Sequence, residues 1–366
     1  MTLRVNGRTV PIIGTARIYV CGITPYGTTH LGHASTFVWV DVLARLLRHT
    51  GVQVEVCRNI TDIDDDMLEQ ARRQQDDWRM LASRQTYRFE DDMRLLRVGH
   101  PTFEPQAHVY VDEVIALASA LLEVGVAYER DGAVYHRGAE VAEGAGLDLD
   151  AALALDAEHG GGRDDGKKDD PRDAPVWQRS VEGEPAWPSP WGPGRPGWHS
   201  ECAAMALATL GSGIDVHAGG ADLAFPHHAF EAAQAEAATG VRPFARSWLH
   251  VGTVTVGGEK MAKSTGNLVL VHELIEDNWP PAAIRLLLID RPWAQSWDYR
   301  ASDLSAAAAR LDRLWSRAGT SSTDPASEKA AIDALVDDLD VPRALAIAEE
   351  AGGHTLRSIG AVLGLF

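Results

Sequence analysis

The segment 21–33 combines a possible metal thiolate with a His-x-Gly-His pattern. Cys21 offers a soft ligand, and His30 and His33 frame Gly32 just before a predicted helix. Helix N-termini present free N–H groups and positive potential to phosphates, and glycine lets a nucleotide approach the backbone closely. The pattern therefore indicates an ATP-phosphate site, although a helix capped by one of the two preceding threonines, with two surface histidines, would also explain it.

A second candidate for phosphate binding is the run Lys260-Met261-Ala262-Lys263-Ser264. The chain has only five lysines, and two of them lie in this run. Lysine concentrates its charge in a compact ammonium, which suits contact with a phosphate chain. Glycines on both sides favour a flap that closes on a ligand and neutralises a departing pyrophosphate. The alternative is an exposed basic turn.

Four residues are candidate ligands for a Zn²⁺ ion: Cys21, Cys202, His227 and Glu231. Thiolate, imidazole and carboxylate are the groups that bind zinc in proteins. His227 and Glu231 stand four residues apart on a predicted helix, so both can face one point. Ligands this far apart have no diagnostic spacing, and His228 could equally be the ligand, with His227 packed in the core.

Composition indicates a globular protein of two or three structural units. The chain has 366 residues, 45% of them hydrophobic, and no apolar run long enough to span a membrane. The N-terminus lacks an apolar signal segment, so we expect a cytoplasmic protein. Three cysteines argue against a disulfide framework, and Cys57, in a strand-like run, is expected in the core. The net charge of −18, without an evident basic patch, argues against nucleic-acid binding.

Periodicity places these motifs at turns of an α/β sheet. A strand over 16–20, a helix over 34–48 and a strand over 52–57 form a β-α-β unit, with the first motif at its first turn. The acid-rich segment 59–66 opens another helix. The remaining expected elements are a helix over 109–124, a hairpin over 127–137, a mobile loop over 160–172, a helix over 200–210, a strand over 214–217, a helix over 227–238, a strand over 248–256, and helices over 306–317 and 332–351.

The His-x-Gly-His pattern and the Lys260 run both lie at turns of a split Rossmann pattern. In this arrangement they resemble the two motifs of class I aminoacyl-tRNA synthetases. Further segments resemble cysteinyl-tRNA synthetases and, more closely, the cysteine ligases of mycothiol biosynthesis, which join cysteine to glucosaminyl-inositol without tRNA. The resemblance covers roughly residues 15–290. It is carried by Tyr19-Val20-Cys21-Gly22-Ile23-Thr24, Asn59-Ile60-Thr61-Asp62-Ile63-Asp64-Asp65, Gly183-Glu184-Pro185-Ala186-Trp187, Gly194-Arg195-Pro196-Gly197-Trp198-His199, Glu201-Cys202 and Phe225-Pro226-His227-His228.

The resemblance implies an α/β fold, a split Rossmann catalytic domain with a connective insertion and a short C-terminal helical domain. The expected boundaries are 1–98 for the first Rossmann half, 99–190 for the insertion and 191–290 for the second half with the Lys260 loop. Residues 291–366 would form a truncated helical domain, and no anticodon-binding domain is expected. We expect a monomer.

The resemblance also implies the role of each site residue. The zinc ligands would be Cys21, Cys202 and His227, with Glu231 matching the fourth ligand of the synthetases. The residues around the substrate cysteine would be Gly22, Thr24, Thr61 and Trp198. ATP, as a complex with Mg²⁺, would bind through its phosphates to His30, Gly32 and His33 and through its adenosine to Gly219, Gly220 and Asp222. The flap lysines would be Lys260 and Lys263.

Several positions depart from the family pattern: Gly27, Ala218, Ala221, Ala229, Thr253 and Ala262. Most of these changes remove polar groups near the expected site. They put the acceptor in doubt more than the activation of cysteine.

The expected reaction is ATP-dependent formation of cysteinyl-adenylate, followed by transfer to the amine of a small acceptor, by resemblance glucosaminyl-inositol. The short, non-basic C-terminal region argues against tRNA as the acceptor. Three alternatives stay open. The chain could be a cysteine ligase of specialised metabolism with another amine or a carrier-bound acceptor, or a truncated cysteinyl-tRNA synthetase. It could also be an inactive paralogue that binds aminoacyl-adenylate or a partner.

Overall fold

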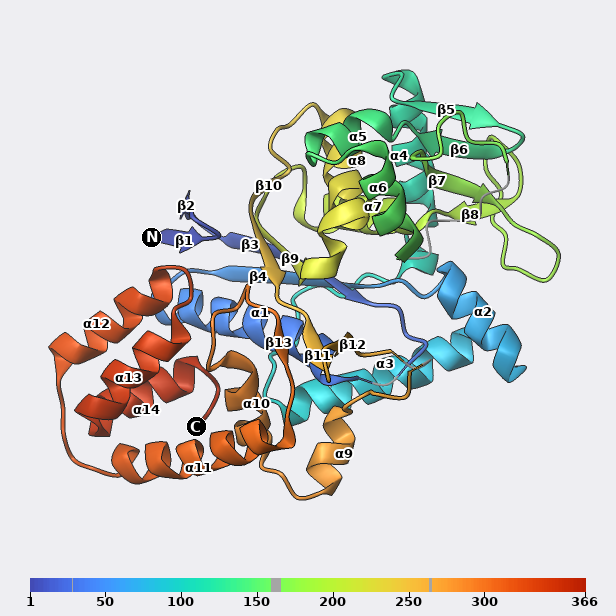
Figure 1. Ribbon diagram of the computed structural model, residues 1–366. Coiled ribbons are helices and arrows are strands. Elements are labelled where there is room, and N and C mark those ends of the chain that lie inside the picture. Colours follow the sequence, from blue (N-terminus) through green and yellow to red (C-terminus); the bar gives the residue numbers. More distant parts are fainter. Residues whose placement is uncertain (28, 159–165, 263–264) are drawn as a thin grey trace.

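The core of the protein is a four-stranded parallel sheet, which confirms the predicted α/β fold (Figure 1). The computed structural model describes residues 1–27, 29–158, 166–262 and 265–366. The strand order is β10-β9-β3-β4, and all three pairings are parallel. The strands are β3 (Ala16–Ile23), β4 (Val54–Ile60), β9 (Ile214–Gly220) and β10 (Ala245–Val251). The sheet therefore joins two parts of the chain that are far apart in sequence, as in a split Rossmann fold.

The first β-α-β unit forms where the sequence predicts it. Between β3 and β4 runs helix α1 (Leu31–His49), whose apolar residues are buried beneath the sheet. Parallel strands place their carboxyl ends at one edge, so the turns after β3, β4 and β9 meet there. Two further helices, α2 (Asp65–Gln74) and α3 (Trp78–Leu95), follow β4.

Residues between α3 and the second half of the sheet form a separate layer. It contains the short turn η1 (Ala107–Val109), α4 (Val111–Glu123), α5 (Ala139–Gly144) and α6 (Leu149–Glu158), and an antiparallel sheet of β5 (Ala127–Arg130), β6 (Ala133–His136), β7 (Ala174–Arg179) and β8 (Gly194–Pro196). The hairpin predicted around Asp131-Gly132 is confirmed, and both residues have positive φ. Residues 160–165 of the predicted loop 160–172 lie outside the described residues, and residues 166–172 form no helix or strand.

The second half of the sheet carries α7 (Trp198–Leu210), η2 (Ala221–Leu223), the irregular turn η3 (Ala224–His228) and α8 (Ala229–Thr239). The single strand predicted over 248–256 is wrong. It is divided into β10 and β11 (Val254–Val256), and β11 pairs with β12 (Glu259–Lys260) and β13 (Trp297–Asp298). The break lies at Gly252, where an added Cβ would come 2.3 Å from the backbone carbon of Gln295.

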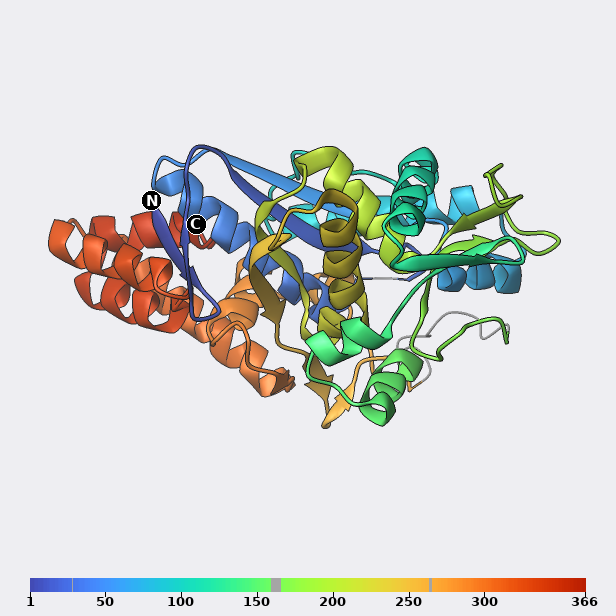
Figure 2. The ribbon, with the colours of Figure 1, turned by 90° about the horizontal axis from the view of Figure 1, so that it is seen from above.

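The C-terminal part is helical, and it lies at the end of the molecule opposite the insertion (Figures 1 and 2). Its helices are α9 (Val271–Glu276), α10 (Pro281–Ile289), α11 (Ala301–Ala318), α12 (Pro325–Val336), α13 (Val341–Ala351) and α14 (Gly353–Val362). The N-terminal hairpin of β1 (Thr2–Val5) and β2 (Arg8–Pro11) also lies near this end.

The expectation of one helix over 332–351 is wrong, because α12 and α13 are separate. Asp338 and Leu339 have positive φ (67° and 55°), which breaks the helix, and Pro342 then favours a new helix start. Within the described part of the chain, no helix combines the length and apolarity that crossing a membrane would need.

A buried arginine joins the C-terminal helices to α1, which packs on the parallel sheet. Arg285 of α10 is fully buried, donates to the carbonyl oxygens of Leu363 (2.6 Å) and Leu96 (2.9 Å), and pairs with Asp41 of α1. Because Asp41 is also buried, each of the two charged groups compensates for the hydration that the other loses on folding.

We expect Arg285→Met to lower the free energy of unfolding by about 3–5 kcal/mol, because it leaves Asp41 buried without this partner. Urea denaturation measures the change. The control is Arg300→Met, whose side chain is 73% exposed and 3.9 Å from Asp298; it should change stability by less than about 0.5 kcal/mol. Equal effects of the two substitutions would contradict the role given to Arg285.

Candidate active site

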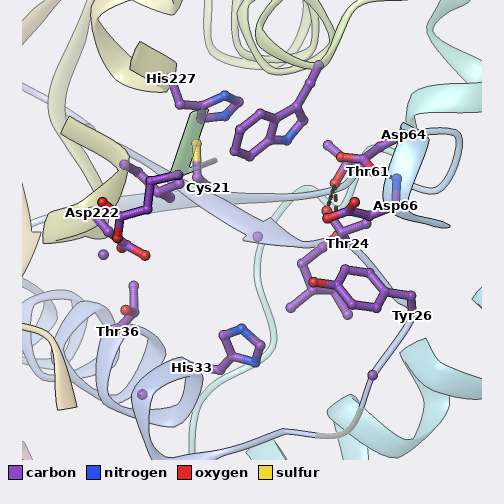
Figure 3. A pocket seen from close by; sticks show the side chains of 18 of the residues that line it. Cys21, Thr24, Tyr26, His33, Thr36, Thr61, Asp64, Asp66, Asp222 and His227 are labelled. Atoms are coloured by element: carbon purple, nitrogen blue, oxygen red, sulfur yellow. Dashed lines mark hydrogen bonds between the residues drawn. The ribbon is translucent and has the colours of Figure 1, made fainter. Parts of the chain in front are cut away.

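A cavity of about 1070 Å³ opens at the carboxyl edge of the parallel sheet. The residues that the sequence analysis selected line it together, although they come from distant parts of the chain (Figure 3). They are Cys21, Gly22, Thr24, His30, Gly32, His33, Thr61, Trp198, Cys202, Gly220, Asp222, His227 and Lys260. Gly219 and Glu231 lie behind this wall, and Lys263 lies outside the described residues.

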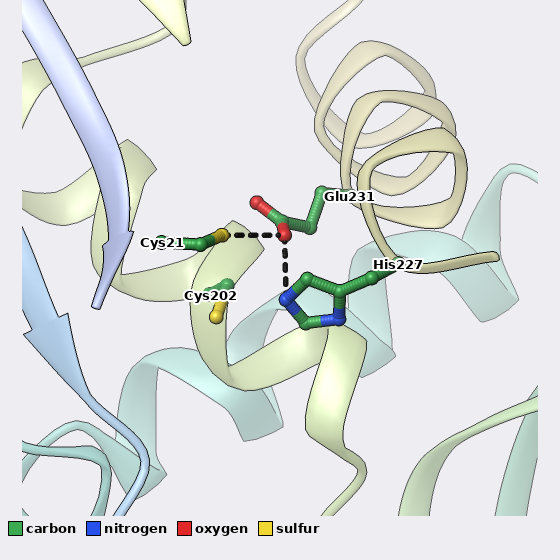
Figure 4. Close-up of side chains that lie close together, drawn as sticks. All are labelled: Cys21, Cys202, His227 and Glu231. Atoms are coloured by element: carbon green, nitrogen blue, oxygen red, sulfur yellow. Dashed lines mark hydrogen bonds and ion pairs between the residues drawn. The ribbon is translucent and has the colours of Figure 1, made fainter. Parts of the chain in front are cut away.

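The four predicted metal ligands converge at one end of the cavity (Figure 4). The ligand atoms of Cys21, Cys202, His227 and Glu231 all lie within 4.8 Å of one another, and all four residues are buried. Glu231 Oε1 is 3.1 Å from Cys21 Sγ and 2.8 Å from His227 Nε2. Two thiols, an imidazole and a carboxylate suit a borderline divalent metal ion such as zinc.

The alternative ligand His228 also has a geometric basis. Cys21, His217, His228 and Glu231 form a second group within 4.8 Å. However, His217 and His228 do not line the cavity, and His228 Nδ1 lies 2.8 Å from His250 Nε2. A metal held by the first group would be accessible to a substrate in the cavity, so the geometry favours His227.

Two polar side chains that the sequence analysis did not select contact the candidate metal ligands. Asn59 Nδ2 donates to Cys202 Sγ over 3.2 Å, and His199 Nδ1 lies 2.8 Å from His227 Nδ1. Trp198 stacks on the other side of His227, with ring centroids 3.9 Å apart. These contacts leave His227 Nε2 directed at the ligand group.

Glu231 is held from both sides. Its Oε1 meets His227, while its Oε2 lies 2.8 Å from His217 Nε2, and both Glu231 and His217 are fully buried. The only sequence signal for His217 is a polar residue in a strand-like apolar run, which is not specific. A histidine that orients a carboxylate in this way fixes which oxygen the metal can reach.

Burial and charge give these groups unusual proton affinities. Burial raises the pKa of the Cys21 thiol well above its ordinary value. Burial lowers the pKa of His227, but Glu231 and Cys202 outweigh it and raise that pKa to about 10. Burial likewise raises the pKa of Glu231, but His227 and His217 lower it well below its ordinary value. Without a metal, the site therefore holds protons at Cys21 and His227 at neutral pH.

Three of the four predicted cysteine-binding residues, Gly22, Thr24 and Thr61, lie at the ends of the neighbouring strands β3 and β4, and the fourth, Trp198, begins α7. Thr24 Oγ1 and Thr61 Oγ1 are 2.7 Å apart. Gly22 N donates to Asn59 Oδ1 over 2.9 Å, and an added Cβ at Gly22 would lie 1.7 Å from the Asn59 carbonyl oxygen. Only glycine allows this close approach of the two strands.

His30 both caps α1 and lines the cavity. Its Nδ1 accepts from the backbone N–H groups of Gly32 (3.2 Å) and His33 (3.4 Å), so the interpretation of a threonine cap is wrong for Thr29, and Thr28 lies outside the described residues. An accepting Nδ1 places the proton of the neutral ring on Nε2. The rings of His30 and His33 stack, with centroids 3.8 Å apart.

The predicted nucleotide turn and the lysine loop lie next to each other. Gly219 and Gly220 end β9, and an added Cβ at Gly219 would come 2.6 Å from His228 Cε1. Lys260 Nζ is 2.6 Å from Asp222 Oδ2, so the loop lysine reaches the nucleotide turn.

The departures from the family pattern divide into two groups. Gly27, Thr253 and Ala262 line the cavity, whereas Ala218, Ala221 and Ala229 do not. Only the first group can change contacts with a substrate directly.

Comparisons with known proteins agree with this geometry. The family described as tRNA synthetases class I (C), catalytic domain, matches residues 11–309. The protein is similar in structure to methionyl-tRNA synthetase of Mycobacterium tuberculosis bound by methionyl-adenylate, with a TM-score of 0.65, 15% identity, and coverage of 96% of this chain and 84% of that one. At this identity the likeness shows the fold alone, which is the class I synthetase fold.

Curated relatives are considerably closer in sequence. An L-cysteine:1D-myo-inositol 2-amino-2-deoxy-α-D-glucopyranoside ligase of Mycolicibacterium vanbaalenii is 47% identical, over 91% of this chain and 80% of that protein. Ligases of the same name from Saccharopolyspora erythraea (46%; 90% and 82%) and Streptomyces griseus (42%; 96% and 90%) are also similar. The chain thus belongs to this ligase family, within the class I (C) tRNA synthetase catalytic-domain family.

Proposed function

We propose that the protein is an ATP-dependent cysteine ligase whose acceptor is glucosaminyl-inositol, as in mycothiol biosynthesis. Cysteine and ATP would give cysteinyl-adenylate and pyrophosphate. The acceptor amine would then attack the acyl carbon, forming the amide C–N bond as the C–O bond to AMP breaks and a proton leaves the amine. The observation that supports this most is one cavity that brings a thiol-binding metal group beside a histidine pair at a helix start.

We propose Zn²⁺ as the metal, held by Cys21, Cys202 and His227. Glu231 would be a fourth ligand through Oε1, since its Oε2 is held by His217. Bound zinc would supply a preference for the thiolate of the substrate. Selection of cysteine over serine would then depend on sulfur chemistry rather than on side-chain size, so editing would be unnecessary.

The other cavity residues would position the two substrates. Thr24, Thr61 and Trp198 would bind the amine and carboxylate of cysteine, and Gly22 would let the substrate lie close to the strand. The phosphates of ATP, with Mg²⁺, would meet His30 and His33 over the start of α1. The adenosine would bind to Gly219, Gly220 and Asp222. The pyrophosphate would bind to Lys260 and Lys263.

We propose the domain division 1–98, 99–190, 191–290 and 291–366. Strand β8 lies just after the boundary at residue 190, although it pairs with β7 and completes the antiparallel sheet of the insertion. We also propose a cytoplasmic monomer that does not use tRNA. The net charge of −18 supports the absence of tRNA binding, because a tRNA-binding surface needs cations.

A different small amine is the second candidate acceptor. Gly27, Thr253 and Ala262 line the cavity and depart from the family pattern, so the part of the cavity that meets the acceptor could differ. Incubation of the zinc-loaded protein with cysteine, ATP and either glucosaminyl-inositol or tRNA tests the choice by mass spectrometry. We expect the glucosaminyl-inositol conjugate. Efficient charging of tRNA would contradict the proposal.

We expect zinc binding at pH 7 to release protons. The raised pKa values of Cys21 and His227 mean that the metal must displace protons from both, so apparent zinc affinity should rise as the pH increases toward about 10. Titration calorimetry in buffers of different ionisation enthalpy counts the released protons. Zinc affinity that does not change between pH 6 and 8 would contradict this ligand set.

A further inference from the structure

One arm of the cavity is not used by the metal, the phosphates or the nucleotide. It is lined by Tyr26 and by four acidic residues at the start of α2, Asp64, Asp65, Asp66 and Glu69. Figure 3 shows Tyr26, Asp64 and Asp66 gathered around the Thr24–Thr61 pair, across the cavity from Cys21 and His227. We call these five lining residues the acidic arm.

A backbone hydrogen bond and a buried arginine fix two of the four carboxylates of the acidic arm. Asp64 caps α2 and accepts from the backbone N–H of Asp66 over 2.7 Å. Asp65 pairs with Arg195 of β8, whose side chain is 1% exposed and also reaches Glu184 over 3.5 Å. The arm therefore has a defined shape that depends on the insertion as well as on α2.

A buried carboxyl group behind the acidic arm lacks hydrogen-bond partners. Glu201 is 1% exposed, and within the described residues neither of its oxygens, nor Nη1 of Arg195, has a partner. Burial raises the pKa of Glu201 well above its ordinary value, and the nearby Asp64 carboxylate raises it further, so Glu201 lies close to the arm. Buried polar atoms are rarely left unpaired, and a group that both donates and accepts, such as a hydroxyl, would satisfy them.

The proposed reaction requires a third substrate that approaches the cysteinyl group. Carboxylates make strong, charge-assisted hydrogen bonds to an ammonium and also accept from hydroxyls. The aromatic face of Tyr26 can pack against the apolar face of a sugar ring. A polyanion such as the end of a tRNA would be repelled by the same carboxylates.

We propose that the acidic arm is the acceptor subsite and that it selects a cationic amino sugar. The inference rests on the proposed function and assigns its acceptor to particular residues. The carboxylates hold the acceptor in its charged form. The ammonium then loses one proton to solvent to give the free amine. The amine attacks the acyl carbon and loses a second proton as the amide C–N bond forms, the C–O bond to AMP breaks and AMP leaves.

The test is the double variant Asp66→Asn/Glu69→Gln. Both side chains belong to exposed residues of α2, and Glu69 also pairs with Arg73 one turn on, so the isosteric changes preserve the fold. We expect the KM for glucosaminyl-inositol to rise about 10- to 100-fold, the usual loss for charge-assisted hydrogen bonds. Cysteine-dependent ATP–pyrophosphate exchange should stay within about twofold of the wild type, because activation precedes acceptor binding.

The matched control is Glu273→Gln/Glu276→Gln on α9, which removes the same charge from exposed residues that do not line the cavity. It should leave the acceptor KM unchanged. If the wild type transfers cysteine to the acceptor and the α2 variant has an unchanged acceptor KM, the acidic arm is not the acceptor subsite, although the proposed function stands. Absence of cysteine-dependent exchange in the wild type would instead overturn the proposed function.

Discussion

Cys202→Ala abolishes zinc binding and lowers cysteine-dependent ATP–pyrophosphate exchange by at least about 10³-fold, if Cys202 is a metal ligand. The Cys202 thiol lies in a buried group with Cys21, His227 and Glu231 and also accepts from Asn59. Loss of one ligand removes the site that would bind the thiolate of the substrate, and a 10³-fold change corresponds to about 4 kcal/mol of transition-state stabilisation. Zinc content by atomic absorption and exchange with saturating ATP measure the two effects.

Cys57→Ala is the matched control. Cys57 is also fully buried and free, but its Sγ contacts Thr209 Oγ1 over 3.2 Å rather than the metal ligands. This variant should keep its zinc and its exchange activity and lose about 1 kcal/mol of stability. Undiminished exchange in Cys202→Ala, or equal zinc loss in both variants, would contradict the metal site.

His30→Asn separates the two roles of His30. Asparagine is a good N-cap, so the variant should retain the stability that the His30 cap gives α1. It lacks the imidazole Nε2–H that would donate to the phosphates, so we expect exchange to fall by about 10²- to 10³-fold. Zinc content and cysteine affinity should not change. Thermal unfolding and exchange kinetics together give both readouts.

His30→Ala is the comparison for this prediction. It removes the cap as well as the imidazole, and we expect it to lose about 0.5–2 kcal/mol of stability in addition to the exchange activity. Full exchange activity in His30→Asn would mean that His30 serves α1 only as a cap.

The sequence predicts the parallel sheet and most of the cavity because both depend on local signals. Apolar periodicity identifies β3, α1 and β4, and the motifs follow strand ends, which must meet at one edge of the sheet. The predicted core position of Cys57 is confirmed for the same reason. Errors occur where tertiary contacts decide, as at Gly252, which lies against Gln295, and at the positive-φ break between α12 and α13.

The supporting shell of the site could not be predicted from the sequence. Asn59 contacts Cys202, 143 residues away, and His217 contacts Glu231, 14 residues away on α8; no spacing pattern encodes either contact. The same holds for Arg195, which fixes Asp65 of the acidic arm from the insertion. Such contacts arise only when the layers pack together.

The most direct test of the account is ATP–pyrophosphate exchange by the zinc-loaded protein with cysteine and with serine. We predict rapid exchange with cysteine, at least about 10³-fold slower exchange with serine because a hydroxyl is a poor ligand for zinc, and loss of the cysteine activity when a chelator removes the metal. Exchange that is absent with cysteine, or that is equally fast with serine, would contradict the claim that this cavity activates cysteine through a metal-bound thiolate.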